Sequence, residues 1–188
     1  MKILKEDDYR ATRWDGGITR EIYLYPETGS YQKREFQVRI SSAVIEKEES
    51  DFTYLPGVSR YLMMQKGTAV LSMPNSEKLL KPGEVFSFEG DVPIHCSGKG
   101  TDLNLMLKDG AEGEMRFCIL EPGEVLLLCS ETKHFMAAYL IGGEAIALPG
   151  SETVRAGETV LADVNEKLEI TCRGTSPVRM AVITWSVK

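Results

Sequence analysis

The stretch Phe36-Gln37-Val38-Arg39-Ile40-Ser41-Ser42-Ala43-Val44 decides the fold, because its side chains alternate between the two faces of an extended strand. Most of the apolar side chains fall on one face, whereas Arg39 and Ser41 fall on the other. An arginine in the middle of a strand needs an acceptor, which can be a buried carboxylate, a row of carbonyl groups or a bound anion. A second arginine, Arg60, follows a Pro-Gly turn and leads into the next predicted strand, Tyr61 to Gln65.

The rest of the chain repeats this strand-and-turn pattern. No segment keeps apolar residues at helical spacing over three turns, and short apolar or alternating runs end at Gly or Pro. The run from Thr101 to Leu107 is a clear example, since it places its leucines on one side and Asp102, Asn104 and Met106 on the other. These features predict an all-β sandwich or barrel.

Two parts of the chain share their turn chemistry at an offset of about 75 residues. A strand, a Gly turn, a second strand, a Pro-Gly-Glu turn and a third strand form the layout of one cupin half. The sequence therefore predicts an all-β bicupin, made of two barrel or sandwich halves, with an N-terminal strand segment. The matched positions are Gly67 with Gly142, Pro82-Gly83-Glu84 with Ala156-Gly157-Glu158, Cys96 with Cys172, and Asp102–Leu107 with Val178–Ile183.

The boundary between the halves is expected in the polar, Gly-rich segment 108–113. Residues 1–108 would then hold the N-terminal segment and the first cupin half, and residues 109–188 the second half. We expect the two halves to pack as one compact unit. The interior positions of the second half are small and apolar, which favours a filled, structural half: Ala137, Ala138, Ala145 and Ala147.

Composition excludes several classes of partner. The 188 residues carry a net charge of −6 with no basic run, which argues against nucleic acid or an anionic membrane as the main partner. No apolar run has the length of a membrane span, and residues 1–7 lack the apolar core of a signal peptide. The four cysteines form no Cys-x-x-Cys pair, so free thiols in a reducing cytoplasm are expected.

The sequence offers no metal site and no catalytic motif. A cupin metal site uses about three histidines and a carboxylate, but this chain has only His95 and His134, in different predicted halves. His95 cannot activate Cys96, because adjacent strand residues face opposite ways. Gly16-Gly17 lacks the following Lys-Ser/Thr of a phosphate-binding loop. We therefore expect no metal, no cofactor and no catalytic residue.

A polar-lined pocket is the remaining candidate site. Arg39 and Arg60 would bind a carboxylate or another anion, and Asp102, Asn104 and Glu21 would accept an amine, amide or imino group. In the alternative, Arg39 pairs with Glu21 or Asp102, and the pocket is a satisfied polar core. The candidate ligand-binding residues converge inside the first barrel, with Arg60 at its rim and a phenylalanine as wall: Thr19, Glu21, Arg39, Ser41, Arg60, Phe88, Asp102 and Asn104.

Five motifs, in order along the chain, resemble the HutD/Ves family. The resemblance covers residues 10–108 well and the second half poorly. The motifs are Gly16-Gly17-Ile18-Thr19-Arg20-Glu21-Ile22, Phe36-x-x-Arg39-Ile40-Ser41-x-Ala43, Phe52-x-x-Leu55-Pro56-Gly57-x-x-Arg60, Phe88-x-Gly90-Asp91 and Asp102-Leu103-Asn104-Leu105-Met106.

The resemblance implies a metal-poor bicupin that is encoded beside histidine-utilisation genes and binds or senses an intermediate of that pathway. The chain departs from the family pattern in two places. It has Trp14-Asp15-Gly16-Gly17 where many members carry an asparagine before the glycines, and Asp102-Leu103 where Asp-Phe is more usual.

Three hypotheses follow. The first is a cytoplasmic protein that binds a small anionic metabolite, such as formylglutamate, formiminoglutamate or urocanate, without catalysis. The second is a metal-independent isomerase or hydrolase with Glu21 or Asp102 as general base. The third is a structural protein whose pocket is closed by internal salt bridges. Dimerisation through exposed strand edges is compatible with each of them.

Overall fold

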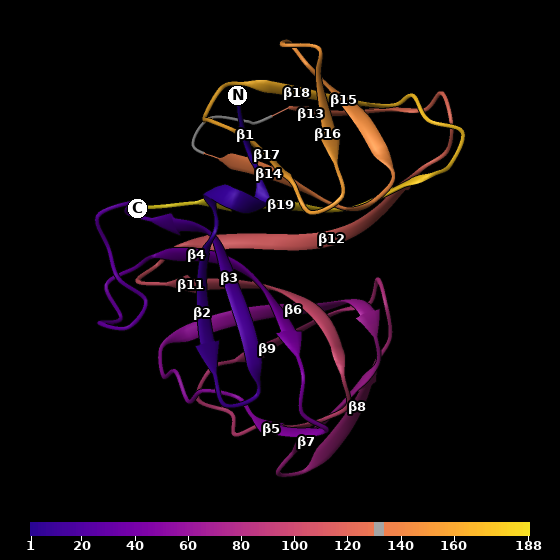
Figure 1. The fold of residues 1–188 in the computed structure, drawn as a ribbon. Helices are drawn as coiled ribbons and strands as arrows, with labels where there is room; N and C mark the ends of the chain where they lie inside the picture. Colours follow the sequence, from indigo (N-terminus) through magenta and orange to yellow (C-terminus); the bar gives the residue numbers. More distant parts are fainter. Residues whose placement is uncertain (130–133) are drawn as a thin grey trace. The chain divides into compact units, whose positions relative to one another are not determined.

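The computed structural model describes residues 1–129 and 134–188 and confirms the all-β prediction (Figure 1). Its one helical segment among these residues is the 3-10 turn η1, Glu6–Asp8. No helix in the described part of the chain is long and apolar enough to cross a membrane. The chain divides into two compact units, one formed by Tyr9–Glu112 and the other by Met1–Asp8 together with Gly113–Lys188.

The unit Tyr9–Glu112 contains two antiparallel sheets. The six-stranded sheet has the order β2 (Arg10–Trp14), β3 (Gly17–Tyr25), β4 (Val38–Ile45), β11 (Gly100–Lys108), β6 (Val58–Gly67) and β9 (Val85–Glu89). The four-stranded sheet has the order β5 (Glu49–Asp51), β10 (His95–Ser97), β7 (Ala69–Met73) and β8 (Ser76–Leu80). Arg39 lies inside β4, as the alternation in that stretch predicts.

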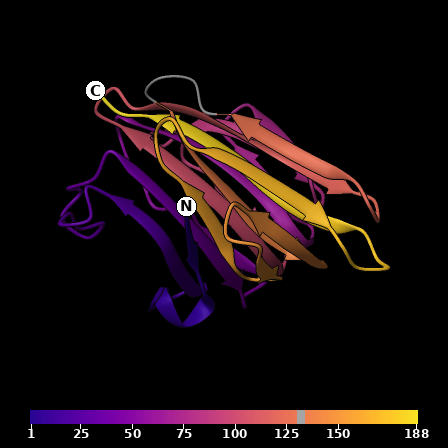
Figure 2. The ribbon, with the colours of Figure 1, turned by 90° about the horizontal axis from the view of Figure 1, so that it is seen from above.

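The second unit also contains two sheets. The five-stranded sheet has the order β1 (Lys2–Leu4), β17 (Thr159–Ala162), β14 (Phe135–Gly142), β19 (Val178–Ser186) and β12 (Glu112–Leu120). The four-stranded sheet has the order β13 (Val125–Cys129), β18 (Lys167–Cys172), β15 (Glu144–Leu148) and β16 (Glu152–Arg155). Figure 2 shows β19, in yellow, as one of the long strands of this unit.

The two units repeat one topology. The order β4-β11-β6-β9 in the first unit matches β12-β19-β14-β17 in the second, and β5-β10-β7-β8 matches β13-β18-β15-β16. The matched strands also follow one another in the same order along the chain, from β4 to β11 and from β12 to β19. The duplication inferred from the turn chemistry is therefore present in the strand order, and the fold is that of a bicupin.

The matched Gly-Glu turns have the same local structure in both units. The backbone N–H of Gly83 donates to Met64 O at 2.9 Å, and that of Gly157 donates to Leu140 O at 2.8 Å. Both glycines have positive φ angles, 81° and 89°, which favour glycine because it lacks a Cβ. The carboxylates of Glu84 and Glu158 each accept a hydrogen bond from the backbone N–H three residues earlier. The sequence repeat thus encodes a turn that fixes the following strand.

The structure shifts three of the expected residue matches. Each unit has a β-bulge, between Thr101 and Asp102 opposite β6 and between Leu140 and Gly142 opposite β19. When the bulges are aligned, Asp102 matches Met180, two residues beyond the expected Val178. Gly67, with a φ angle of 77°, likewise matches Gly143, with 85°, rather than Gly142. With Ala69 aligned on Ala145, Cys96 also matches Ile170 rather than Cys172. Because the bulge is present in both units, these shifts come from strand connections of different length, which a constant sequence offset cannot represent.

The N-terminal residues pair with the second unit. Lys2, Ile3 and Leu4 of β1 lie opposite Leu161, Val160 and Thr159 of β17 (Figure 1). The sequence analysis instead assigned residues 1–8 to the first half. Pairing between strands so far apart along the chain leaves no local signature in either of them.

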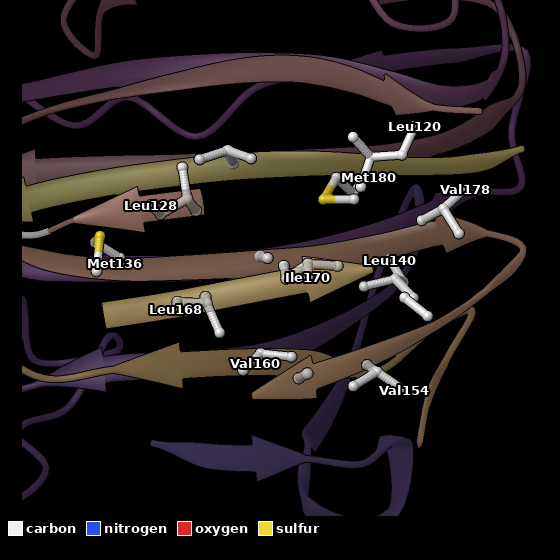
Figure 3. Packing of buried hydrophobic residues seen from close by; sticks show 14 of the residues in the cluster. Leu120, Leu128, Met136, Leu140, Val154, Val160, Leu168, Ile170, Val178 and Met180 are labelled. Atoms are coloured by element: carbon white, nitrogen blue, oxygen red, sulfur yellow. The ribbon is translucent and has the colours of Figure 1, made fainter. Parts of the chain in front are cut away.

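The core of the second unit is apolar throughout its main cluster (Figure 3). Met136, Leu140, Ile170 and Met180 are fully buried or nearly so, and they pack with Ala138, Ala145 and Ala147 in that cluster. In the first unit a separate apolar cluster fills the space between the sheets around Leu62, Leu71 and Cys96. Six of the seven buried polar or charged residues in the described chain belong to the first unit: Arg39, Ser41, Ser42, Arg60, Asp102 and Asn104.

Candidate functional site

The first unit contains a cavity of about 160 Å³. An engineered cavity of about 150 Å³ holds a molecule of benzene, so the space suits a small molecule or the end of a larger one. Six of the eight predicted residues line it: Thr19, Arg39, Ser41, Arg60, Asp102 and Asn104. Glu21 and Phe88 are not among its lining residues, but each contacts one of its arginines.

Arg39 is held by four neighbours, one of which is Met106, whose Sδ lies 3.9 Å from Nη1. Its Nε donates to Glu21 Oε2 at 2.8 Å, and its Nη1 donates to Ser41 Oγ at 3.0 Å. Its guanidinium also lies 3.9 Å from the centre of the Tyr31 ring, within cation–π range. The ion pair with Glu21 is the structural arrangement that the sequence left open. Glu21 is therefore engaged by Arg39 and lies outside the cavity.

Arg60 is less completely paired. It lies within β6 and follows the Pro56-Gly57 turn as expected, but it is only 5% exposed and is therefore buried rather than at the rim. Its guanidinium lies 5.1 Å and 5.0 Å from the ring centres of Phe52 and Phe88. Among the described residues its Nε has no hydrogen-bond partner. Burial lowers the pKa of Arg60 to about 10, which leaves it charged at neutral pH.

Asp102 lies in β11 and is buried beside the arginines. Its Oδ1 accepts a hydrogen bond from the backbone N–H of Ala43 at 3.2 Å. Burial raises the pKa of Asp102 to about 7, although the charges of Arg60 and Arg39 and the Ala43 N–H oppose this rise. The carboxyl group can therefore gain or lose a proton near neutral pH.

The β-bulge fixes the backbone at Asp102. Gln65 is the extra residue of β6 at this bulge, and its Nε2 donates to the carbonyl oxygen of Asp102 at 2.6 Å. The hydroxyl of Ser42, on β4, donates to the same carbonyl at 2.9 Å. Side chains of both neighbouring strands thus hold β11 at the position from which Asp102 faces the cavity.

Two further polar atoms at the cavity lack partners. Asn104 Oδ1 and Trp14 Nε1 are buried, and neither has a hydrogen-bond partner in the described structure. Both residues line the cavity. Buried polar groups are nearly always hydrogen-bonded, so one acceptor and one donor remain for a bound molecule or water.

Sequence analysis missed several lining residues, including Tyr31, Phe52 and Asp51. Tyr31 lies in a segment expected to be a polar loop, and its aromatic ring was the only sign of a different role. Phe52 stands in one of the five motifs, where its spacing from Arg60 could have indicated the stacking that the structure shows.

Trp14, which precedes the Gly16-Gly17 pair, lines the cavity. A Cβ on Gly16 would lie 2.1 Å from the Trp14 ring. The first glycine of the Gly16-Gly17 pair therefore leaves space for this aromatic wall, which is a close approach that only glycine permits.

Neither His95 nor His134 is among the residues that line the cavity. His95 of β10 contacts Glu49 and Asp51 of β5, and these hydrogen bonds raise the pKa of its imidazole. Among residues 1–129 and 134–188 no group of three or more His, Cys, Asp or Glu side chains is placed to hold a metal ion. The side chains described at the cavity favour an anion, because two arginines flank one buried carboxyl.

Comparison with known families agrees with this geometry. A model of the HutD family matches residues 6–180. The chain belongs to the HutD family. The match extends well beyond the five motifs of the first half and includes nearly all of the second, which the motifs left poorly covered.

Solved structures share the HutD fold. PA5104 of Pseudomonas aeruginosa PAO1, a conserved protein of unknown function, aligns with a TM-score of 0.84 at 20% identity, over 99% of this chain and 98% of its own. HutD of Pseudomonas fluorescens SBW25, solved in a formate condition, aligns with a TM-score of 0.78 at 21% identity, over 100% and 98%. A point mutant of Bacillus subtilis oxalate decarboxylase OxdC aligns with a TM-score of 0.69 at 10% identity, over 96% and 76%. None of the curated proteins matches the sequence significantly.

Proposed function

We propose that this HutD-family protein binds a small anionic metabolite in the cavity of the first unit. The observation that carries the proposal is Arg60, a buried guanidinium whose Nε faces no partner in the described structure. Burying an unpaired charge is costly, whereas a charge-assisted hydrogen bond to a carboxylate satisfies it. Arg39 lines the same cavity, but its charge is paired with Glu21, so Arg60 is the guanidinium that remains for the ligand.

The remaining unpaired atoms indicate what else the ligand carries. Asn104 Oδ1 needs a donor, which an amide, imino or hydroxyl group supplies. Trp14 Nε1 needs an acceptor. A carboxylate with a nearby N–H or O–H therefore fits the cavity better than a carboxylate on a plain hydrocarbon.

Membership of the HutD family supports a proposal about the metabolic source of the ligand. An intermediate of histidine degradation, such as formylglutamate, formiminoglutamate or urocanate, combines a carboxylate with nitrogen donors. Formate, present in the condition of the P. fluorescens HutD structure, is the smallest carboxylate. We propose a role in sensing or buffering such an intermediate in the cytoplasm.

A thermal-shift screen tests the proposal. The panel holds formate, glutarate, formylglutamate, formiminoglutamate and urocanate, with divalent metals measured separately. A ligand at about 100 times its Kd stabilises the folded state by about 2.7 kcal/mol, which is a visible shift. Stabilisation by one carboxylate, lost in Arg60→Met and kept in the surface control Arg13→Met, supports the proposal. A flat panel overturns it.

The second candidate is a metal-independent enzyme, favoured by one observation. Asp102 lines the cavity and titrates near neutral pH, as a general base requires. Glu21, the other carboxylate considered from sequence, is engaged by Arg39 and is a poorer candidate. Incubation with the same panel, followed by chromatography, tests this candidate: turnover that disappears in Asp102→Asn while binding persists would replace the binding role with catalysis.

A further inference from the structure

The two acidic residues that line the cavity lie in opposite surroundings. Asp51 is exposed, and its carboxylate pairs with the imidazole of His95 at 2.7 Å. Asp102 is buried, accepts one hydrogen bond from Ala43 N, and has no ion pair within 4.0 Å among the described residues. Asp102 therefore lacks the close cationic partner that would hold a buried carboxylate in its charged form.

The charge of the cavity depends on the protonation of this one group. Glu21 offsets Arg39 through a direct ion pair. The other guanidinium, on Arg60, is balanced only at longer range by Asp102 when that carboxyl is ionised. With Asp102 charged, an entering carboxylate would place two anions beside a single unpaired guanidinium. With Asp102 neutral, the negative charge of the ligand carboxylate balances the positive charge of the Arg60 guanidinium.

We propose that Asp102 takes up a proton when the cavity binds a small carboxylate, so that the anion and the proton enter together. This inference rests on the proposed anion binding. In the bound state Asp102 is a neutral acid whose O–H can donate to the ligand carboxylate. Such O–H···O⁻ hydrogen bonds are short and strong. A buried aspartic acid that stays neutral and donates a hydrogen bond is an established device at other protein sites.

The neighbours of Asp102 are consistent with this role. Its pKa of about 7 allows the free site to exchange the proton near neutral pH. The thiol of Cys96 does not compete for that proton, because burial raises its pKa to about 11. The charged and titratable groups around Asp102 are Arg60 from β6, Arg39 from β4 and Cys96 from β10, with Tyr31 and Asp51 of β5 on the wall of the same cavity.

Calorimetry with glutarate, formylglutamate and urocanate tests the inference. Each titration is run in MOPS and in Tris, because the difference in heat between buffers of different ionisation enthalpy counts the protons taken up. Uptake should approach one proton at about pH 8 and fall towards zero at about pH 5.5. Affinity should fall about tenfold per pH unit above the pKa of Asp102.

Two variants identify the side chain that takes up the proton. Asp102→Asn keeps the shape of the side chain and should remove both the uptake and the pH dependence. His95→Gln removes the other group beside the cavity that titrates in this range, and it should leave both unchanged. Uptake that persists in Asp102→Asn but disappears in His95→Gln overturns the inference.

The failures of the two proposals can be told apart. If none of the three carboxylates gives heat at any pH, anion binding fails, and the proton uptake fails with it. If one binds with equal heat in both buffers, anion binding stands and only the proton uptake is overturned. If Asp102→Asn does not fold, carboxyl 13C NMR of the wild-type complex at about pH 8 decides. The signal of a neutral acid supports the inference, and that of a carboxylate contradicts it.

Discussion

The two units of this protein share one topology but use its interior differently. With the bulges aligned, Arg60, Asp102 and Asn104 of the first unit match Met136, Met180 and Val182 of the second. All six side chains are buried. The polar set surrounds a cavity, whereas the apolar set closes a core that Figure 3 shows filled with leucine, valine, isoleucine and methionine side chains. One strand framework thus supports either a binding site or a packed core, depending on a few inward positions.

The contrast extends to the edge strands. In the first unit, Asp51 and His95 lie opposite each other on β5 and β10 and form an ion pair. With Leu71 of β7 aligned on Ala147 of β15, the positions that match Asp51 and His95 are Leu127 of β13 and Glu169 of β18. Leu127 is exposed. In the first unit an ion pair beside the cavity therefore links the edge strand β5 to β10. In the second unit the corresponding position on the edge strand β13 carries an apolar side chain.

The largest expected effect comes from placing the aspartate of the first unit in the second. Met180→Asp buries a carboxylate in an apolar cluster with no arginine beside it in the described core. We expect a loss of about 3–5 kcal/mol in the free energy of unfolding, measured by urea denaturation. Met180→Leu is the control, with an expected loss below about 1.5 kcal/mol. A tolerated aspartate would show that the second core has room for polar groups.

The next effect is on the pH dependence of stability. Because the folded pKa of Asp102 lies near 7, above its ordinary value of 3.8, the folded state favours the protonated form. Its contribution to stability is fully present below about pH 4 and is lost as the pH rises to about 7. The loss amounts to at most about 4 kcal/mol.

Asp102→Asn should remove this slope, so that the variant gains stability relative to wild type between about pH 4 and 7. Urea denaturation across that range measures the difference. Parallel curves would mean that Asp102 stays charged in the folded protein.

A smaller effect is expected when the first unit receives the residue of the second. Arg60→Met should weaken carboxylate binding about 10- to 100-fold, as for the loss of a charged hydrogen bond. Calorimetry measures the Kd. The control is Arg13→Met, a change to an exposed arginine paired with Glu46 in the same unit, which should leave the Kd unchanged. Equal affinity in both variants would place the anion elsewhere.

The smallest effect concerns the contacts of His95 on β10 with Asp51 and Glu49 on the edge strand β5. Hydrogen bonds to Asp51 and Glu49 raise the pKa of His95 above 6.5, so their stabilising contribution is present below that pH and disappears as the pH rises through the folded pKa. His95→Gln should lower the Tm slightly at about pH 5.5 and leave it unchanged at about pH 8.5. A constant difference at both values would indicate a role for the imidazole other than its charge.

Much of the polar wall could be predicted from alternation within single strands. Arg39 with Ser41 and Asp102 with Asn104 each share one strand face, and all four line the cavity. Arg60 was placed at the rim because Pro56-Gly57 suggested a later strand start, whereas β6 begins at Val58. A turn marks a strand boundary only to within a few residues.

Other features depend on contacts between distant residues. Tyr31 reaches Arg39 from outside the strands, and no periodic pattern predicts such a position. The bulges at Ile22 and Gln65 interrupt pairing without a local signal, so strand registers beyond them could not be assigned from sequence. The sequence therefore predicted which polar side chains share a strand face. The pairing register of the strands and the position of loop residues such as Tyr31 required the structure.

The pairing of β1 with β17 has a consequence for biosynthesis. Lys2–Leu4 are synthesised long before their partner, Thr159–Ala162. The segment Tyr9–Glu112 contains both of its sheets and can fold while translation continues. β1 must meanwhile stay unpaired, and the second unit cannot complete its five-stranded sheet until β19 has emerged. Early nascent chains thus expose a free strand whose capture by another chain would lead to misassembly.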